Sequence, residues 1–323
     1  MEKLLELRDL SINYLVKDGA LSAVHQLNFD IHRGEIFALV GESGCGKSTV
    51  AFSIMRLLQG NEVVDGEIVF QGEDLLSLDE AKMEKIRGKH IGMIFQNPLD
   101  SLNPVYTSGS QVAEAISLDE KDKNVILEKV IKLYESVRIP DATERVKSYP
   151  HELSGGMRQR VMIAMMLSRN PQLLIADEPT TALDVTVEAQ ILKLLRELRD
   201  DFGSAILLIT HNFGIVAELA DRVGIMYAGE LMELADVEEI FHCPVHPYSK
   251  ALMASLPRIT KEQGRLKTLE GTVPRIIGEF QGCRFSNRCE HAIEECFQRK
   301  PELLEWRPGH FVQCLNKEVL HGD

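Results

Sequence analysis

Apolar and polar residues alternate near the N-terminus of the chain, and an unbroken apolar run follows them. Residues 4–12 and 27–31 alternate, as strands with one solvated face do. Residues 36–40 are apolar throughout, which is typical of a strand that is buried on both faces. The pattern therefore predicts short strands over the first 40 residues, with the last of them inside a sheet.

Further along the chain, apolar strands alternate with helical patterns. A charged helix and a strand are expected before residue 96, and residues 97–167 are mainly helical in pattern. Short apolar runs at 173–176, 205–209 and 223–227 predict three more strands, and a helix with one apolar face lies between the first two. This alternation predicts an α/β core into which a helical subdomain is inserted.

The pattern changes after residue 235, where six of the chain's 12 prolines lie and no long periodic run remains. Residues 236–323 are therefore predicted to form a separate C-terminal extension. The expected division is a nucleotide-binding core at 1–96 and 168–235, a helical subdomain at 97–167, and this extension.

Composition narrows the class of protein. The 323 residues carry 36 basic and 49 acidic side chains, for a net charge of −13. Because nucleic-acid binders usually present a basic face, and no run of Lys or Arg occurs, we expect no nucleic-acid partner. No apolar stretch approaches the ~18 residues of a membrane span. The first residues lack a signal-peptide pattern, so a cytoplasmic protein is expected.

A phosphate-binding loop is predicted at residues 41–48, GESGCGKS, directly after the apolar run at 36–40. Glycines let successive N–H groups point at phosphates, and the following helix adds the positive end of its dipole. Lys47 is expected to reach the β- and γ-phosphates, Ser48 to bind Mg²⁺, and the Cys45 thiol to be exposed. The candidate nucleotide-binding residues of the loop are Gly41, Ser43, Gly44, Cys45, Gly46, Lys47, Ser48 and Thr49.

Two carboxylates end the apolar run of 173–178, LLIADE. Asp177 is expected to bind Mg²⁺, directly or through water. Glu178 is placed to act as the general base that polarises an attacking water molecule.

Four further segments narrow the class: FQNP at 95–98, LSGGM at 153–157, ALD at 182–184, and His211. With the phosphate loop and the carboxylates, they make residues 3–235 resemble the ATPase subunits of ABC transporters. The resemblance implies that Gln96 approaches Mg²⁺ and the water, and that His211 contacts the γ-phosphate. It also implies that the loop at 97–104 receives the transporter's coupling helix. A plain loop is the alternative for that segment.

The same resemblance assigns roles across a dimer. Ser154, Gly155 and Gly156 would cap ATP held by the opposite subunit, and Asp184 would link the two sites. An ordinary helix N-cap is the alternative for Ser154. Tyr14 lies where the family stacks an aromatic ring on adenine, although a buried core tyrosine is the competing interpretation.

The extension resembles the oligopeptide, dipeptide and nickel branch of these ATPases. HCPVHPY at 242–248 matches that branch through its Pro, His and Tyr residues, and we interpret this segment as a rigid packed turn rather than a metal site. Its four cysteines are Cys283, Cys289, Cys296 and Cys314. Their spacing, C-x₅-C-x₆-C-x₁₇-C, departs from common zinc and ferredoxin patterns. The resemblance implies a [4Fe–4S] cluster, with Zn²⁺ or unligated thiols as alternatives.

These observations predict an α/β fold: an ABC-type ATPase with a P-loop RecA-like core, an antiparallel β subdomain, an inserted helical subdomain and a cysteine-containing extension. The expected function is ATP hydrolysis that powers a di- or oligopeptide importer at the cytoplasmic face of the cell membrane. Implied partners are a second ATPase, making a heterodimer, two transmembrane permeases and an extracytoplasmic substrate-binding protein. Alternatives are nickel or another small solute as cargo, or a non-transport ABC ATPase of DNA repair or translation.

Overall fold

A computed structural model describes residues 2–96, 102–180, 185–256 and 269–321. The chain divides into two compact units. The first comprises Met1–Ser77 and Ile209–Asp323, and the second comprises Leu78–Leu208. Within the described residues, no helix is both long and apolar enough to cross a bilayer.

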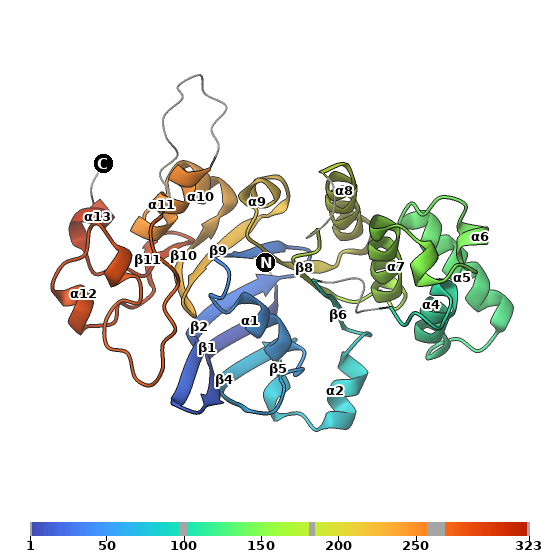
Figure 1. The fold of residues 1–323 in the computed structure, drawn as a ribbon, viewed down its shortest axis with the longest axis horizontal. Coiled ribbons are helices and arrows are strands. Elements are labelled where there is room, and N and C mark those ends of the chain that lie inside the picture. The colour runs from blue at the N-terminus through green and yellow to red at the C-terminus, as the bar shows by residue number, and fades with distance from the viewer. Residues whose placement is uncertain (1, 97–101, 181–184, 257–268, 322–323) are drawn as a thin grey trace, which may run out of the picture. The chain divides into compact units, whose positions relative to one another are not determined.

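An antiparallel sheet near the N-terminus belongs to the first unit (Figure 1). Its strands lie in the order β2-β1-β4-β5. They are β1 (Lys3–Val16), β2 (Gly19–His32), β4 (Glu62–Phe70) and β5 (Glu73–Asp74), and the short 3₁₀ helix η1 (Leu75–Ser77) follows. The alternation predicted for residues 4–12 is confirmed only in part: Leu5, Leu7, Leu10 and Ile12 are buried, but Leu4 is buried as well, and the register with β2 shifts between Leu7 and Leu10.

A mixed sheet forms the remainder of the first unit's framework. Five strands lie in the order β11-β12-β10-β9-β3. They are β3 (Ile36–Val40), β9 (Arg222–Tyr227), β10 (Glu230–Asp236), β11 (Leu304–Arg307) and β12 (His310–Val312). Strand β3 runs parallel to β9, and all five of its residues are buried, as the apolar run predicts.

Helices of the first unit connect and cover these strands. They are α1 (Lys47–Ile54), α9 (Phe213–Leu219), α10 (Val237–His242), α11 (Pro247–Ser255), η3 (Ser286–Arg288), α12 (Glu295–Gln298) and α13 (Lys317–His321). One apolar cluster contains side chains of β9, α9, α11 and the extension, including Tyr227, Phe213, Tyr248 and Phe285. The extension is therefore packed into the core of the first unit.

The hairpin β11–β12 departs from what the periodicity predicts. Residues 236–323 lack a strand pattern, yet β12 pairs with β10, where Glu233 faces Val312. The predicted extension thus adds strands to the same sheet as the phosphate loop's strand.

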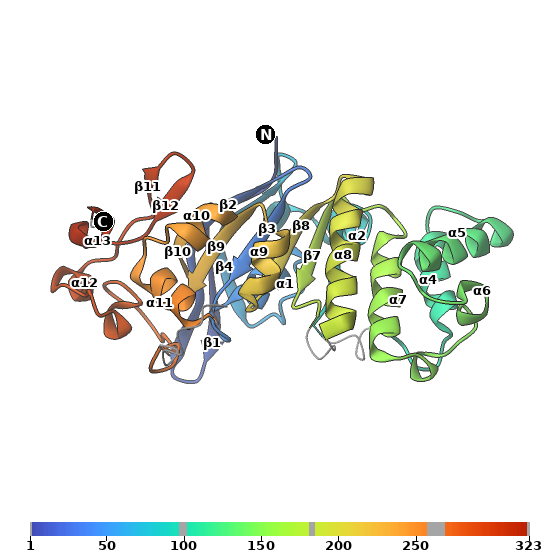
Figure 2. The same ribbon diagram turned by 90° about the horizontal axis from the view of Figure 1, so that it is seen from above.

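In the second unit, strands lie in the order β8-β7-β6, and β6 runs parallel to β7. They are β6 (Ile91–Ile94), β7 (Leu173–Asp177) and β8 (Ala205–Thr210), the last ending in the first unit. The helices are α2 (Glu80–Ile86), α4 (Ser108–Ser117), α5 (Lys123–Ser136), α6 (Ala142–Arg145), η2 (Pro150–Glu152), α7 (Gly155–Leu167) and α8 (Val185–Phe202). Figures 1 and 2 both show α4 to α7 as one helical group, so the predicted helical character of residues 97–167 is confirmed for the described part.

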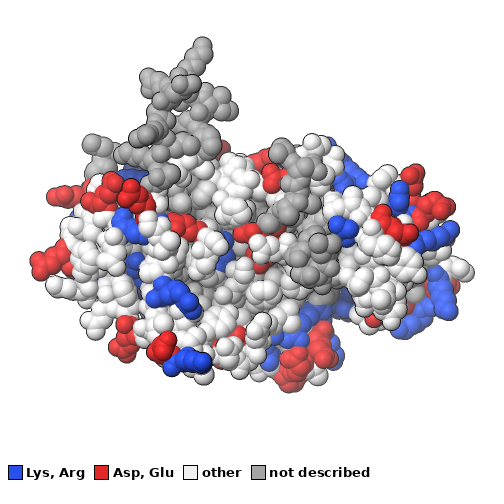
Figure 3. Space-filling view, viewed as in Figure 1, with Lys and Arg blue, Asp and Glu red and all other residues white. Residues whose placement is uncertain are grey.

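Charged side chains are mixed on the face seen in Figure 3. Blue Lys and Arg atoms lie interspersed with red Asp and Glu atoms among the described residues there.

Candidate functional site

The predicted phosphate loop connects β3 to α1, as its sequence context requires. Gly41 lies so close to β9 that a Cβ there would be 2.1 Å from the carbonyl oxygen of Met226. Gly46 has a φ of 107°, and a Cβ there would lie 2.4 Å from the carbonyl oxygen of Ala23. The chain folds this way because only glycine permits such approaches and such a φ. Ser43 and Gly44, by contrast, are exposed on the loop's surface.

Lys47 places its ammonium inside the loop. Its Nζ donates hydrogen bonds to the carbonyl oxygens of Gly41 at 2.8 Å and Glu42 at 3.0 Å, and the residue is buried. Ser48 and Thr49 follow in the first turn of α1 and are half-buried. A cation and a helix N-terminus thus meet at the loop, an arrangement that suits phosphate groups.

The expectation that the Cys45 thiol is exposed is wrong. Cys45 is 1% exposed, and burial raises the pKa of its thiol. Tyr14 in β1 is half-buried, and its hydroxyl lies 3.5 Å from Oγ1 of Thr49. The ring therefore lies beside α1 with part of its surface open.

In the second unit, Asp177 is the last residue of β7 and Glu178 follows it directly. Asp177 is 3% exposed, and Glu178 adopts a φ of 46°. A left-handed conformation at a non-glycine residue costs about 1–3 kcal/mol. Nε2 of Gln96 donates a hydrogen bond of 2.8 Å to Oε2 of Glu178. The structure thus brings together two candidates that lie 82 positions apart in the chain.

Ser154 is the N-cap of α7, and its hydroxyl accepts a hydrogen bond from the amide of Met157 at 3.3 Å. Gly155 and Gly156 form the first turn of that helix. A Cβ on Gly156 would lie 2.6 Å from Cγ1 of Val187, so the helix start approaches α8 closely. Gln159 is not part of the motifs named above. Its Nε2 donates a hydrogen bond of 2.8 Å to the carbonyl oxygen of Pro179, which links α7 to the segment that follows Glu178.

The remaining candidates are only partly described. His211 directly follows β8 and is exposed, in the first unit. Asp184 and residues 97–101 lie outside the described residues, so the expectations for them stay predictions.

The four cysteines of the extension, the candidate ligands of an iron–sulfur cluster, all lie among the described residues. Cys283 and Cys296 are buried, Cys289 and Cys314 are partly buried, and the amide of Cys283 donates to the carbonyl oxygen of Cys296 at 2.7 Å. Burial first, and then the neighbouring thiols, raise the pKa of Cys283 to about 12 and that of Cys289 to about 11. Across the described residues, no group of three or more His, Cys, Asp or Glu side chains could hold a metal ion, so the expected iron–sulfur cluster is not supported.

The segment at 242–248 is a packed turn, as interpreted. Oxygens of the Glu233 carboxylate accept the amides of Val245 at 2.8 Å and His246 at 2.9 Å. His246 caps α11 by accepting the amide of Tyr248 at 3.0 Å through Nδ1. Burial lowers the pKa of His246 to about 4, which keeps the ring neutral.

Sequence patterns did not predict one set of contacts at the phosphate loop. The backbone amide of Glu42 donates to the Tyr248 hydroxyl, and its carboxylate pairs with Arg288. These partners lie 206 and 246 positions away in the chain. The only local signals are the Tyr of the 242–248 segment and an arginine beside Cys289.

Comparison with known proteins agrees with this geometry. Residues 24–181 match the ABC transporter family, and residues 232–296 match the oligopeptide/dipeptide transporter C-terminal region. A probable peptide ABC transporter ATP-binding protein of Sinorhizobium fredii is 48% identical over 96% of this chain and 94% of its own length. The oligopeptide transport ATP-binding protein OppD of Haemophilus influenzae is 46% identical over 97% of both chains. The dipeptide transport ATP-binding protein DppD of Bacillus subtilis is 44% identical over 100% and 99%.

Among solved structures, the dimeric ATP-binding cassette MJ0796 in a post-hydrolysis state bound to ADP and Pi is similar. It has a TM-score of 0.66 and 26% identity, over 72% of this chain and 99% of that one. The fold and the site thus define an ATP-binding cassette, which hydrolyses ATP. More narrowly, the chain belongs to the ABC transporter family, among the oligopeptide and dipeptide transport ATP-binding proteins.

Proposed function

We propose that this chain is the ATP-hydrolysing subunit of an importer for di- and oligopeptides. The observation that carries the proposal is the pairing of a complete set of ATPase motifs with a C-terminal region of the oligopeptide/dipeptide type at 232–296. Relatives named for oligopeptide or dipeptide transport align over nearly the whole chain. Nickel or another small solute remains the alternative cargo.

In the proposed reaction, Glu178 polarises the water that attacks the γ-phosphate of ATP. The hydrogen bond from Gln96 supports this role, because it orients one oxygen of the Glu178 carboxylate. Lys47 is proposed to exchange its two carbonyl partners for phosphate oxygens of ATP, and His211 to contact the γ-phosphate.

The donor set suits Mg²⁺, which prefers oxygen ligands. We propose that Ser48 and Asp177 would hold the ion and that Gln96 would approach it. The ion would neutralise charge on the transferred phosphoryl group. Ser48 supplies a hydroxyl at the start of α1, and Asp177 supplies a buried carboxylate at the end of β7.

Two nucleotide-binding subunits are proposed to close on ATP. The capped start of α7, with exposed Ser154 and two glycines, offers amide groups that suit the γ-phosphate of ATP on a partner's phosphate loop. Asp184 is proposed to link the two sites, and Tyr14 to stack on adenine. We propose a related but different ATPase as partner, two membrane permeases, and an extracytoplasmic binding protein that supplies cargo. The chain would then sit at the cytoplasmic face of the cell membrane.

A narrower proposal concerns the four cysteines, which could bind a [4Fe–4S] cluster or Zn²⁺. The hydrogen bond of 2.7 Å from the Cys283 amide to the Cys296 carbonyl oxygen brings two of the four residues together, whereas the described residues do not form a metal site. Anaerobic purification should yield iron and acid-labile sulfide in equal amounts. Zinc without iron would favour a zinc site. A protein purified with neither iron nor zinc would overturn the proposal.

The function is tested by tagging the chain at its N-terminus, solubilising host membranes gently, and identifying the proteins that co-purify. Two multispanning permeases and a second ATPase are expected, after which the associated binding protein can be screened with peptides and nickel. Recovery only with ribosomes or DNA would contradict transport and favour the translation or DNA-repair alternative.

A further inference from the structure

Glu42, the second residue of the phosphate loop, is held by the C-terminal extension at both its main chain and its side chain. Its amide donates a hydrogen bond of 3.2 Å to the Tyr248 hydroxyl. Its Oε2 lies 3.0 Å from Nη1 of Arg288. Its carbonyl oxygen accepts the Lys47 ammonium at 3.0 Å. Glu42 is thus a junction between the lysine that is expected to bind phosphate and two residues of the extension.

Tyr248 is rigidly placed for this contact. His246 caps the start of α11 and fixes the backbone of Tyr248. The Tyr248 ring is fully buried, packs edge-on against Tyr227 with centroids 4.8 Å apart, and contacts Phe285 in a tilted arrangement at 5.2 Å. Burial raises the pKa of the Tyr248 hydroxyl, so the group stays neutral and can accept the Glu42 amide at physiological pH.

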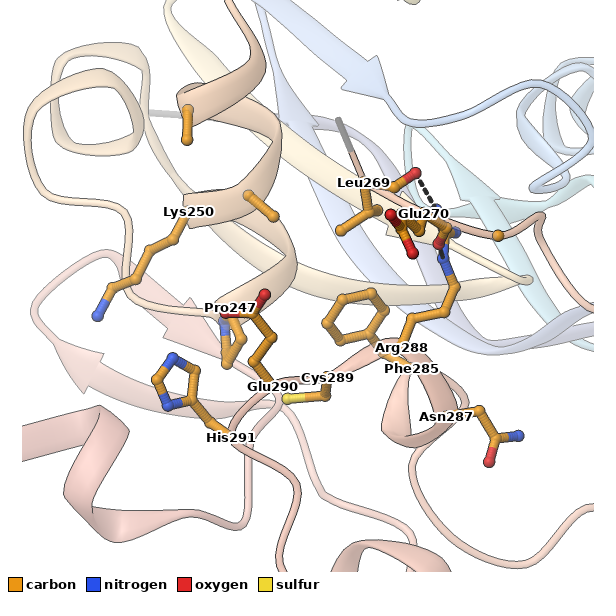
Figure 4. A pocket seen from close by; sticks show the side chains of 13 residues that line it. Pro247, Lys250, Leu269, Glu270, Phe285, Asn287, Arg288, Cys289, Glu290 and His291 are labelled. Carbon is orange, nitrogen blue, oxygen red and sulfur yellow. Dashed lines mark hydrogen bonds between the residues drawn. The ribbon is translucent and has the colours of Figure 1, made fainter. Parts of the chain in front are cut away.

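Arg288 is equally constrained. Nε donates to the carbonyl oxygen of Glu270 at 2.9 Å, and Nη2 donates to that of Leu269 at 3.3 Å. Nη1 also lies 3.3 Å from the Tyr227 hydroxyl, and the guanidinium sits over the Tyr227 ring at 5.5 Å. Figure 4 shows the side chain of Arg288 extending toward Leu269 and Glu270, while the Cys289 thiol points elsewhere. The planar fork of arginine makes these contacts together, which a lysine cannot do.

A second connection reaches the middle of the loop. Arg284 donates through Nη1 to the carbonyl oxygen of Ala228 and through Nη2 to the Ser22 hydroxyl at 2.8 Å. The amide of the next residue, Gly229, donates a hydrogen bond of 2.9 Å to the carbonyl oxygen of Cys45. The turn between β9 and β10 is therefore fixed by the extension on one side and supports the phosphate loop on the other.

We infer that Tyr248 and Arg288 are positioning residues for ATP binding, because they hold Glu42 and thereby the first turn of the phosphate loop. In the proposed reaction Lys47 exchanges the Glu42 carbonyl for phosphate oxygens, which leaves the Cys45 amide, at 3.3 Å, as the loop's own hydrogen bond to that carbonyl. The contacts from the extension remain, so the amides stay aimed at the nucleotide without a fresh ordering cost. One buried oxygen of the Glu42 carboxylate, Oε1, lacks a hydrogen-bond partner among the described residues. It provides an acceptor that water or a shifted donor can use when ATP binds.

This inference rests on the proposed use of the loop for ATP, and it is tested on the purified full-length chain. Tyr248→Phe removes only the hydroxyl, Arg288→Gln removes the charge, and Glu42→Gln removes the other half of the ion pair. Mg-ATP affinity is measured by calorimetry and thermal unfolding by scanning calorimetry. Arg299→Gln is the matched control, because Arg299 lies in the same extension and pairs only with exposed Glu295 in the described contacts.

We expect Tyr248→Phe to raise the dissociation constant of Mg-ATP about 3- to 10-fold, the effect of one lost hydrogen bond. Arg288→Gln should weaken binding at least as much, Arg288→Lys should restore part of it, and Arg299→Gln should leave it unchanged. Because Glu42 and Arg288 act as a pair, the double variant that combines Glu42→Gln with Arg288→Gln should lose less affinity for Mg-ATP than the sum of the two single losses. In the co-purified complex, KM for ATP should rise while kcat at saturation changes little.

Equal ATP affinity in wild type, Tyr248→Phe and Arg288→Gln, with lower unfolding temperatures, would overturn the inference and leave these contacts as attachment of the extension. Tyr248→Phe keeps the test decisive if Arg288→Gln does not fold, because the phenyl ring preserves the packing. A wild-type chain that binds no ATP would instead contradict the proposed function. The affinity losses together with absent peptide transport would contradict only the cargo.

Discussion

Gly46→Ala should destabilise the chain much more than Gly44→Ala, although both glycines lie in the phosphate loop. Their φ values are 107° and 81°, so an alanine at either position is strained by about 1–2 kcal/mol. The surrounding space differs. A Cβ at Gly46 would lie 2.4 Å from the carbonyl oxygen of Ala23 and 2.9 Å from Cε of Met226, whereas one at Gly44 would meet nothing within 4 Å.

The clash at Gly46 involves backbone, since Ala23 lies in β2, which pairs with β1. Overpacking that forces such a shift costs about 1–3 kcal/mol. We therefore expect losses in the free energy of unfolding of about 2–5 kcal/mol for Gly46→Ala and about 1–2 kcal/mol for Gly44→Ala.

The assay is urea unfolding of the full-length chain, followed by far-ultraviolet circular dichroism, with the m-value compared among variants. A lower midpoint at an unchanged m-value would measure the loss of stability directly. Equal midpoints for the two variants would refute the reasoning, because conformational strain alone would then account for both. A larger loss for Gly44→Ala would show that the loop packs differently from the geometry given above.

Three further predictions concern the catalytic carboxylate, the start of α7 and a buried histidine. Glu178→Gln should retain ATP binding and the hydrogen bond from Gln96, but lower turnover about 10²- to 10⁴-fold, since an amide is no general base; this is measured by phosphate release. Ser154→Arg should block hydrolysis at the site formed with a partner's phosphate loop, yet leave ATP binding at this chain's Lys47 unchanged; calorimetry on the isolated chain checks this. His246→Asn should reduce the loss of stability between pH 6.5 and about 4, a range in which this one histidine contributes a loss of up to about 1.4 kcal/mol per pH unit.

The sign of the last effect follows from burial. The pKa of His246 is lowered to about 4 in the folded chain, so the unfolded chain binds the extra proton as pH falls below 6.5 and stability falls with it. Asparagine can still cap α11, and an unchanged pH slope in that variant would assign the effect to other groups. If Glu178→Gln turned over ATP at a near wild-type rate, its assignment as the general base would be refuted. If Ser154→Arg abolished ATP binding by this chain itself, that would count against a site shared between two subunits.

Local features of the fold could be predicted because their causes are local. The apolar run at 36–40 coincides with β3 (Ile36–Val40), and the run at 205–209 differs from β8 (Ala205–Thr210) by one residue. The phosphate loop was equally predictable, since glycines at 41 and 46 permit backbone conformations and approaches that other residues do not. The burial of Cys45 could not be predicted, because it depends on what packs over the loop.

The hairpin β11–β12 could not be predicted from periodicity. Strand β11 is mostly exposed, the turn contains Pro308, and of the two buried residues of β12 one is the polar His310, so the hairpin lacks an apolar alternation. What stabilises the hairpin is distant in sequence: β12 pairs with β10, and buried His310 lies 2.7 Å from the carboxylate of Glu233. Such partners become visible only when the chain is folded.

The sequence alone determined the class of chemistry, because each motif acts through its own short stretch of backbone: a loop that curls around phosphate, carboxylates at a strand end, a serine that caps a helix. The tertiary structure alone decided which of these groups meet. It brought Gln96 within hydrogen-bonding distance of Glu178, 82 positions away in the chain. It also brought Tyr248 and Arg288 to Glu42, although each lies more than 200 positions from it. Long-range hydrogen bonds depend on the path of the whole chain, and hydrophobic periodicity carries no record of a partner so far away.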